Sequence, residues 1–198
     1  MILAFDTSTA ACTAALFDGS GDCIAHRDEL IGRGHAERLV PMIDELLDGR
    51  SASRVLVGVG PGSFTGIRVA IAAAHGLAIG WDAELAGISS LALIAAGSDG
   101  EVAVAVAGGH GELFVQQFED GTSVSELRNL APAAAAAETG ANLVIGSGSR
   151  QLVDARGWGE AREAWPSASE ALKLPEALRT LPAKPVYARA PDARATAA

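Results

Sequence analysis

The chain has 198 residues, of which 15 are lysine or arginine and 24 are aspartate or glutamate, so its formal net charge is −9. Hydrophobic residues make up 49% and charged residues 20%, a balance typical of a globular chain, which excludes disorder for most of its length. Only two lysines occur, Lys173 and Lys184. Because nucleic-acid binding needs clustered cations, so acidic a chain is expected to reach RNA only through a partner.

The chain's start and its cysteines indicate the compartment. Residues 1–6 lack a basic segment and end on an acid, so no signal peptide is predicted. No apolar run approaches the ~18–20 residues that span a bilayer. Cys12 and Cys23 are too few for a disulfide framework or a four-ligand zinc site, and both are expected to be reduced core thiols. We therefore expect a cytoplasmic protein without a membrane segment.

The first half of the chain predicts a three-stranded antiparallel meander followed by alternating helices and strands. Turn-forming Asp18-Gly19-Ser20-Gly21 separates the second and third strands. Leu39, Ile43 and Leu46 recur at helical spacing, and Ser89 is placed to cap a later helix. The expected strands cover residues 2–6, 12–17, 22–29, 55–59 and 85–88, and the expected helices cover residues 36–47, 67–79 and 89–96.

The second half predicts a shorter unit of related design. The expected strands cover residues 102–107, 113–118, 123–127 and 143–145, and the expected helices cover residues 133–139 and 151–155. Residues up to 181 are weakly helical, and the tail over 182–198 is expected to be extended and then frayed. The chain is thus predicted to hold an N-terminal lobe over residues 1–99, which carries the partner interface, and a smaller C-terminal lobe over residues 100–198.

A glycine-rich segment joins a predicted strand to a predicted helix and reads Gly58-Val59-Gly60-Pro61-Gly62-Ser63-Phe64-Thr65-Gly66. Free backbone N–H groups at such a position favour an anion, but the segment matches neither the Walker A loop nor the dinucleotide fingerprint. Two interpretations stay open. Either the glycines only let the helix pack closely, or the loop binds a phosphate with help from Arg68.

A second candidate loop, Asp6-Thr7-Ser8-Thr9, follows the first strand. It is either an ordinary Asx turn or the first phosphate loop of a two-lobed ATP-using protein. The latter requires a matching acid on the second lobe to hold the metal, but the equivalent turn reads Ala107-Gly108-Gly109-His110. A peptidase is supported only by scattered serines and histidines, because no Gly-x-Ser-x-Gly sequence lies between a strand and a helix.

The first two helices are apolar over more than the ~100° stripe that one core contact requires. One helix has a smooth face of Ala70, Ala73, Ala74 and Leu77, and the other has a bulky stripe of Leu39, Met42, Ile43 and Leu46. Either their own lobe covers both faces, or the outer face buries against another subunit.

Several segments together resemble a known family, densely to about residue 93 and intermittently to the tail. They are residues 2–9 (ILAFDTST), 34–41 (GHAERLVP), 60–68 (GPGSFTGIR), 76–78 (GLA), 87–91 (GISSL), 146–148 (GSG) and 187–193 (YARAPDA). This set resembles the TsaB (YeaZ) family, and the GPGSFTGIR string in its strand-to-helix context is the most specific part.

The resemblance implies an α/β, actin-like and Hsp70-like fold of the sugar-kinase superfamily, with two ribonuclease-H-like lobes of which the second is abbreviated. It implies a non-catalytic subunit that binds TsaD in the threonylcarbamoylation of adenosine 37 in tRNAs that read codons beginning with A. TsaD would hold the metal and transfer the group, and the ATPase TsaE would bind the pair. No cofactor is expected, although a nucleotide at the TsaB–TsaD junction stays open.

The resemblance also assigns residues by position. A helical partner interface would give a heterodimer or heterotetramer with TsaD and a homodimer when the chain is alone. This interface would comprise His35, Leu39, Met42, Ile43, Leu46, Val69, Ala70, Ala73 and Leu77. Vestigial phosphate loops would comprise Asp6, Thr7, Ser8, Gly62, Ser63, Thr65, Gly66 and Arg68, and no catalytic or metal-binding residue is expected.

One departure from the family bears on the choice of function. Many members have an Asp-Ala-Arg-Arg-type turn where this chain has Ala107-Gly108-Gly109-His110. The difference weakens an enzymatic interpretation and does not touch the first two helices. The alternative function is an ATP-dependent small-molecule kinase of the same fold, which would need nucleotide affinity and an acid on each lobe.

Overall fold

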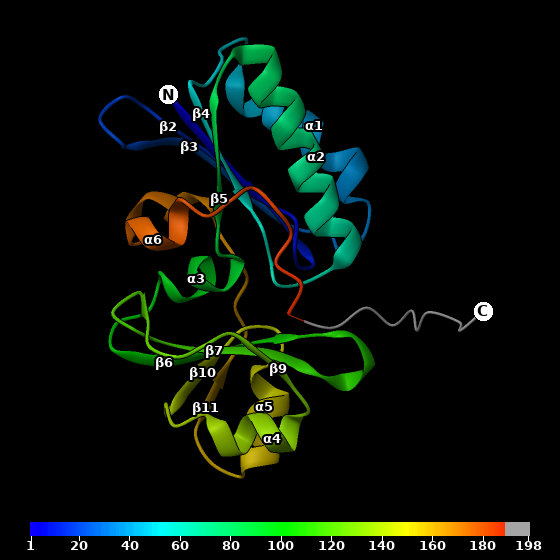
Figure 1. Cartoon of the computed structure of the whole chain (residues 1–198), viewed down its shortest axis with the longest axis vertical. Coiled ribbons are helices and arrows are strands. Elements are labelled where there is room, and N and C mark those ends of the chain that lie inside the picture. The colour runs from blue at the N-terminus through cyan, green and yellow to red at the C-terminus, as the bar shows by residue number, and fades with distance from the viewer. Residues whose placement is uncertain (189–198) are drawn as a thin grey trace, which may run out of the picture.

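The computed structural model describes residues 1–188. Figure 1 shows the first sheet in the upper half of the molecule, with α1 and α2 beside it, and the second sheet in the lower half, with α4 and α5 below it. Helix α3 lies between the two sheets (Figure 1). The chain therefore forms two lobes, each a sheet covered by helices.

The first sheet has the strand order β3-β2-β1-β4-β5. Strand β2 runs antiparallel to β1 and β3, whereas β1, β4 and β5 are parallel. The strands are β1 (Ile2–Asp6), β2 (Ala11–Phe17), β3 (Cys23–Leu30), β4 (Arg54–Gly58) and β5 (Glu84–Ile88). All five predicted strands of this half are present, with bounds that differ by at most one residue at either end.

Alternation along these strands builds two separate cores. In β1, Leu3 and Phe5 pack beneath α1 (His35–Leu47) and α2 (Phe64–Trp81). Ala4, between them, faces the other way, into the core shared with the second lobe. Because successive side chains of a strand point to opposite faces, one sheet supports both layers.

Two serine caps set where the helices of the first lobe begin. The Ser63 Oγ accepts a hydrogen bond from Gly66 N at 3.2 Å, so α2 begins at Phe64, three residues before the predicted start at residue 67. The Ser89 Oγ accepts one from Ala92 N at 3.3 Å and caps α3 (Ser90–Ala95), as predicted. The first turn of α2 thus includes residues that were predicted to be loop.

The second sheet repeats this design with the order β11-β10-β6-β7-β8, and β9 pairs with β7. Its strands are β6 (Glu101–Ala107), β7 (Leu113–Glu119), β8 (Thr122–Ser123), β9 (Arg128–Leu130), β10 (Leu143–Ile145) and β11 (Glu160–Arg162). The helical segments are η1 (Gly109–Gly111), α4 (Pro132–Glu138) and α5 (Ser149–Arg156). Parallel β6, β10 and β11 beside antiparallel β7 match β1, β4, β5 and β2, which confirms two ribonuclease-H-like lobes.

Two strand predictions in the second half are corrected. The strand expected over residues 123–127 is mostly absent: only Ser123 belongs to a strand, β8, and β9 begins after the predicted range. The Ser125 side chain accepts a hydrogen bond from Gln117 N at 2.8 Å and interrupts the ladder between β8 and β9. Strand β11 was not predicted, since only Ala161 of its three residues is partly buried and no apolar alternation marks it.

The end of the described chain leaves the second sheet and returns to the first. Segment η2 (Ala168–Lys173) packs on β1, β2 and β3, and α6 (Glu176–Arg179) packs on β5. Ala168 N donates to Thr13 Oγ1 at 2.7 Å, and Ser167 Oγ donates to Asp28 Oδ2 at 2.7 Å. The predicted unit over residues 100–198 therefore contributes a segment to the first lobe, while the part of the tail and of the YARAPDA motif from residue 189 onwards lies outside the described residues.

The two cysteines lie in different environments. Cys12, on β2, is buried beneath α1, and burial raises the pKa of its thiol to about 11. Cys23 is exposed at the start of β3, which contradicts its expected place in the core. Strand β3 is at the edge of the sheet, so most of its side chains meet solvent.

Candidate functional site

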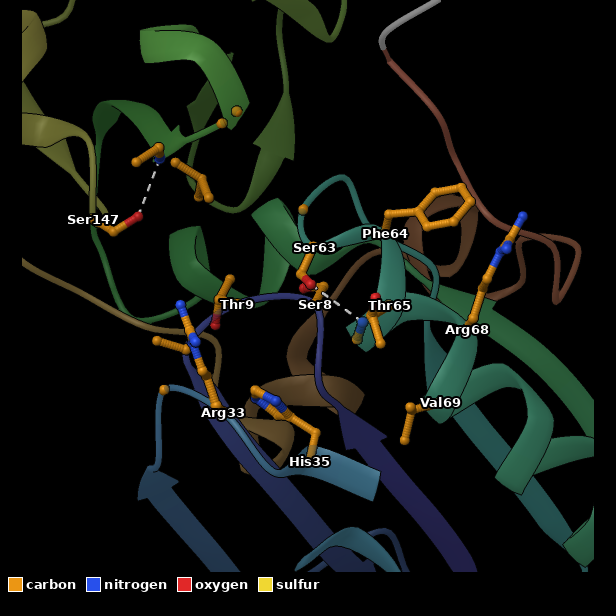
Figure 2. Close-up of a pocket in the computed structure, with 18 of the residues that line it drawn as sticks. Ser8, Thr9, Arg33, His35, Ser63, Phe64, Thr65, Arg68, Val69 and Ser147 are labelled. Carbon is orange, nitrogen blue, oxygen red and sulfur yellow. Dashed lines mark hydrogen bonds between the residues drawn. The ribbon is translucent and has the colours of Figure 1, made fainter. Parts of the chain in front are cut away.

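A cleft of about 1560 Å³ opens between the two lobes. Figure 2 shows Ser8 and Thr9 of the first lobe next to Ser63 at the start of α2, with Ser147 of the second lobe opposite them. The formally charged residues that line it are Arg33, Glu37 and Arg68. Residues 186–188 of the described chain close one side.

Asp6, the acid predicted at the first loop, is fully buried below this cleft. Its Oδ1 accepts hydrogen bonds from the backbone N–H and the hydroxyl of Ser8, both at 2.7 Å, and its Oδ2 accepts one from the Ser90 hydroxyl. Burial raises the pKa of this carboxyl above its ordinary value, against the lowering effect of the Ser90 and Ser8 hydrogen bonds. Both oxygens are therefore used to join β1 to its own turn and to α3.

The glycines of the GPGSFTGIR loop let two backbone turns touch. A Cβ at Gly62 would overlap the Ser8 carbonyl, and one at Gly66 would overlap the Thr7 carbonyl. Ser63 N donates to Ser8 O at 2.6 Å, and Thr7 Oγ1 donates to Gly66 O at 2.7 Å. The two predicted phosphate loops thus contact each other directly. This favours the interpretation that the glycines allow close packing.

The second lobe brings its equivalent turns together in the same way. Ala107 N donates to the Ser147 hydroxyl at 3.1 Å (Figure 2), and a Cβ at Gly148 would overlap Leu113. The turn from Ala107 to His110 supplies no carboxylate to the cleft. Within residues 1–188, no group of three His, Cys, Asp or Glu side chains is placed to hold a metal ion.

Most of the predicted interface residues lie inside the first lobe, which corrects their assignment. The side chains at most 3% exposed are Leu39, Met42, Ile43, Leu46 and Ala70. They pack against the sheet because α1 and α2 turn their bulkiest stripes toward β1, β2 and β4. His35, Val69, Ala73 and Leu77 are half-buried and border the exposed surface.

The exposed sides of α1 and α2 carry different residues, which the sequence prediction did not single out. Val40 is 58% exposed and Ile79 is 82% exposed. Ala72, Gly76 and Gly80 are exposed beside Ile79 on α2. We call these five residues the docking face. Their signal in the sequence is that residues 64–81 contain no acid and only one formal charge, so the outer side of α2 had to be apolar as well.

The length and composition of α2 add to this observation. Taken alone, this helix is long and apolar enough to cross a membrane, contrary to the expectation that no such run exists, yet its inner side packs on β4 and β5. At Gly76 and Gly80, a Cβ atom would meet no heavy atom within 4 Å apart from the adjoining residues and the backbone of α2 itself. A glycine inside a helix costs about 0.5–1 kcal/mol of stability relative to alanine. Because there is room for a larger side chain at both positions, packing within the described residues does not explain either glycine.

Ion pairs hold α1 in place on the sheet. Arg38 Nη2 lies 2.6 Å from Glu29 Oε1 of β3, and Arg38 Nη1 lies 2.8 Å from Glu45 Oε1, about two turns further along the same face of α1. The Arg38 guanidinium lowers the pKa of both carboxyls. This bidentate pair lies on the side of α1 next to β3, and Val40, two residues on from Arg38 and therefore about 200° round the helix, lies on the opposite side.

Comparison with known proteins identifies relatives for much of the chain. The family model described as "TsaD: tRNA N6-adenosine threonylcarbamoyltransferase" matches residues 28–150. The tRNA threonylcarbamoyladenosine biosynthesis protein TsaB of Escherichia coli is 41% identical over 102 residues, and that of Haemophilus influenzae is 44% identical over 99 residues. These alignments cover 49% and 48% of this chain but only 43% and 41% of the relatives, so the chain matches under half the length of each of these two proteins.

Solved structures match over nearly the whole chain. A Pseudomonas aeruginosa protein, described as uncharacterized with similarity to peptidase YEAZ, superposes with a TM-score of 0.79 at 30% identity, over 95% of this chain and 99% of that one. The structure of YeaZ from Pseudomonas aeruginosa superposes with a TM-score of 0.77 at 29% identity, over 94% and 98% of the two chains. With these matches, the chain belongs to the TsaB (YeaZ) family.

Proposed function

We propose that this chain is the non-catalytic, TsaD-binding subunit in the threonylcarbamoylation of adenosine 37 in tRNAs that read codons beginning with A. The names of its relatives support the pathway. The docking face supports the role of a subunit. In this role the chain completes a complex whose chemistry takes place on the partner.

The observation that carries the proposal is the outer side of α2. Ile79 leaves 82% of its surface in water, and Gly76 and Gly80 next to it are helix-weakening residues without a packing partner in the described chain. Burying one such aliphatic side chain stabilises a complex by about 1.5–3 kcal/mol. Glycines also let a second backbone come close. A second helix on this face would therefore offset both the exposure of Ile79 to water and the weakening of α2 by its glycines.

The family model indicates which partner would fit. The model described as TsaD matches residues 28–150, a range that contains α1 and α2. A TsaD chain is then expected to own the equivalent helix pair. Two related folds can pack these pairs face to face about an approximate two-fold axis, as homodimers do with identical surfaces. The same face would serve a homodimer when the partner is absent.

The cleft supports the absence of catalysis. Both oxygens of Asp6 are engaged within the protein, and the opposite turn at Ala107 carries no acid. A kinase of this fold would need both positions to hold a metal–nucleotide complex. We therefore propose that the chain binds no cofactor of its own. TsaE would engage the assembled pair, and the tRNA would be contacted through the partner because this chain is acidic.

Size-exclusion chromatography with light scattering, on the chain alone and mixed with its cognate TsaD, tests the proposal. We expect a complex with one copy or two copies of each subunit, and a homodimer for the chain alone. Absence of a complex with and without Mg²⁺ and ATP would overturn the proposal. Micromolar ATP binding by the isolated chain would then favour the kinase alternative.

A further inference from the structure

Three side chains form a half-exposed cluster where α2 begins. The Arg68 guanidinium carbon lies 3.6 Å from the centre of the Phe64 ring, and the Phe64 and Tyr187 rings are stacked with centroids 5.5 Å apart. Arg68 Nε donates a hydrogen bond to the Tyr187 hydroxyl at 3.1 Å. We call Phe64, Arg68 and Tyr187 the aromatic cluster. In Figure 2, Phe64 and Arg68 both point from α2 toward the C-terminal segment.

The chain holds Tyr187 in this position through its backbone. Leu181 and Gly87 exchange backbone hydrogen bonds of 3.0 and 2.6 Å, and Val186 N donates to Val59 O at 2.8 Å. The segment over residues 181–187 is therefore tied to the ends of β4 and β5. This attachment places Tyr187 on the first turn of α2, although the sequence separates Tyr187 from Arg68 by 119 residues.

The aromatic cluster continues the docking face. Phe64, Arg68, Ala72 and Ile79 follow one another at helical spacings of four, four and seven, so they form one stripe along the exposed side of α2. Phe64 remains 53% exposed and Tyr187 remains 50% exposed. The stripe thus ends in two aromatic rings whose outer surfaces are uncovered.

Arg68 adds a positive charge whose hydrogen-bond donors are only partly used. Its Nε bonds Tyr187, whereas none of the ion pairs formed within residues 1–188 includes Arg68. Stacking on Phe64 fixes the plane of the guanidinium and leaves its terminal nitrogens available. A planar arginine held in this way suits a carboxylate better than a lysine would, because it can donate two parallel hydrogen bonds.

We propose that the aromatic cluster is the anchor of the partner interface. In this interface a carboxylate of the partner pairs with Arg68, and an apolar side chain of the partner covers the rings of Phe64 and Tyr187. The inference rests on the proposed function, because the occupant is the TsaD subunit. It adds that the interface includes the C-terminal segment as well as the two helices. Tyrosine and arginine in such positions often dominate the binding energy of an interface.

The test is the affinity for TsaD of single variants, by calorimetry. We expect Tyr187→Ala to weaken binding by about 30-fold or more, the range of dominant interface residues. Tyr187→Phe keeps the ring and loses only the bond to Arg68, so a loss of about 3–10-fold is expected. Because Arg68 is part of α2, the Arg68→Gln variant tests the aromatic cluster without altering the C-terminal segment, and it should also weaken binding.

A matched control exists on the second lobe. Trp158 is 48% exposed, and the guanidinium carbon of the half-buried Arg156 lies 3.6 Å from the centre of its ring, so the second lobe carries a second arginine–aromatic pair after α5. Trp158→Ala should leave the affinity for TsaD unchanged. Thermal unfolding of each isolated variant shows whether the fold is kept, and little change is expected for side chains so exposed.

The two proposals fail in different ways. If Tyr187→Ala and Arg68→Gln bind TsaD as tightly as the wild type while Ile79→Asp does not bind, the anchor is wrong and the docking face stands. If Ile79→Asp also binds normally, the partner uses another surface and both proposals fall. Both also fall if the wild-type chain does not bind TsaD.

Discussion

Ser90, the first residue of α3, donates a hydrogen bond to the buried Asp6 carboxylate at the end of β1. The same Ser90 hydroxyl accepts a hydrogen bond from Gly60 N at 3.0 Å. One hydroxyl thus connects β1, the loop before α2 and the helix between the lobes. This arrangement makes the first acid of the chain part of the core of the fold.

Ser90→Ala should destabilise the protein and do so more at high pH. The variant leaves an acceptor on Asp6 and a donor on Gly60 unpaired and buried, which costs about 1–3 kcal/mol. The lost hydrogen bond had lowered the pKa of Asp6, so that pKa rises further above its ordinary value of 3.8. The native state then holds its proton to higher pH than the unfolded state, and stability falls as pH rises through the native pKa.

Urea unfolding at about pH 4.5 and pH 7.5 measures this effect. Ser89→Ala is the control, because it removes the cap of α3, at a cost of about 1 kcal/mol, without touching Asp6. Its loss should be the same at both pH values. A pH-independent loss for Ser90→Ala would contradict the role assigned to its bond with Asp6.

Gly76→Ala should stabilise the isolated chain and weaken the complex. Apart from the adjoining residues and the backbone of α2 itself, no heavy atom of the described residues lies within 4 Å of the new methyl group, so the unfolding free energy should rise by about 0.5–1 kcal/mol. At a close helix contact the same methyl group should cost about 1–3 kcal/mol of binding, roughly 5- to 150-fold in affinity.

Unfolding of the free chain and titration against TsaD measure the two effects of Gly76→Ala. Ala134→Leu, on the exposed side of α4 in the second lobe, is the control for an enlarged helix surface and should bind normally. Unchanged affinity for Gly76→Ala would show that no partner backbone approaches this glycine.

Two neighbouring alanines of α2 should separate the core from the docking face. Ala70 is fully buried, so Ala70→Asp places an unpaired charge in the core and should unfold the first lobe or lower its stability by several kcal/mol. Ala72 is exposed, so Ala72→Asp should keep the fold and lose the partner, at a cost on the order of 2–5 kcal/mol. Circular dichroism and co-elution with TsaD distinguish these outcomes, and a folded Ala70→Asp chain would contradict the burial.

Gly58→Ala should be among the most damaging changes in the first lobe. A Cβ at this position would overlap the carboxylate of Asp6, which three hydrogen bonds hold in place. The expected loss is about 3 kcal/mol or more. Gly97→Ala, where no heavy atom lies within 4 Å, is the control and should be nearly neutral. Comparable thermal stability of the two variants would show that Asp6 can move aside.

Much of the fold was predictable because local patterns were consistent. The apolar run at residues 2–5, the helical spacing of Leu39, Ile43 and Leu46, and the cap at Ser89 each correspond to an observed element. The errors occur where a single side-chain hydrogen bond, and not the hydrophobic pattern, sets the bounds of an element. Ser125 interrupts one predicted strand through a hydrogen bond to Gln117, and Ser63 starts α2 three residues early.

The candidate site was less predictable, since most of the residues predicted for the interface are buried inside the first lobe. Both sides of α2 are apolar, so spacing alone cannot say whether Ala70 or Ala72 faces the sheet. The open choice for the glycine loop had the same origin. Glycine is equally suited to binding a phosphate and to letting Thr7 and Ser8 approach, and only the packed structure distinguishes these roles.

By itself, the sequence determined the order of most elements, the repeated α/β design and the family, because these depend on periodicity and on motifs of adjacent residues. Only the tertiary structure decided that Asp6 is enclosed by Ser8 and Ser90, that Leu39 and Ala70 belong to the core, and that Tyr187 stacks on Phe64. The physical reason is separation along the chain. Contacts between residues far apart in the sequence exist only once the sheets have formed, and they determine which apolar face is left for a partner.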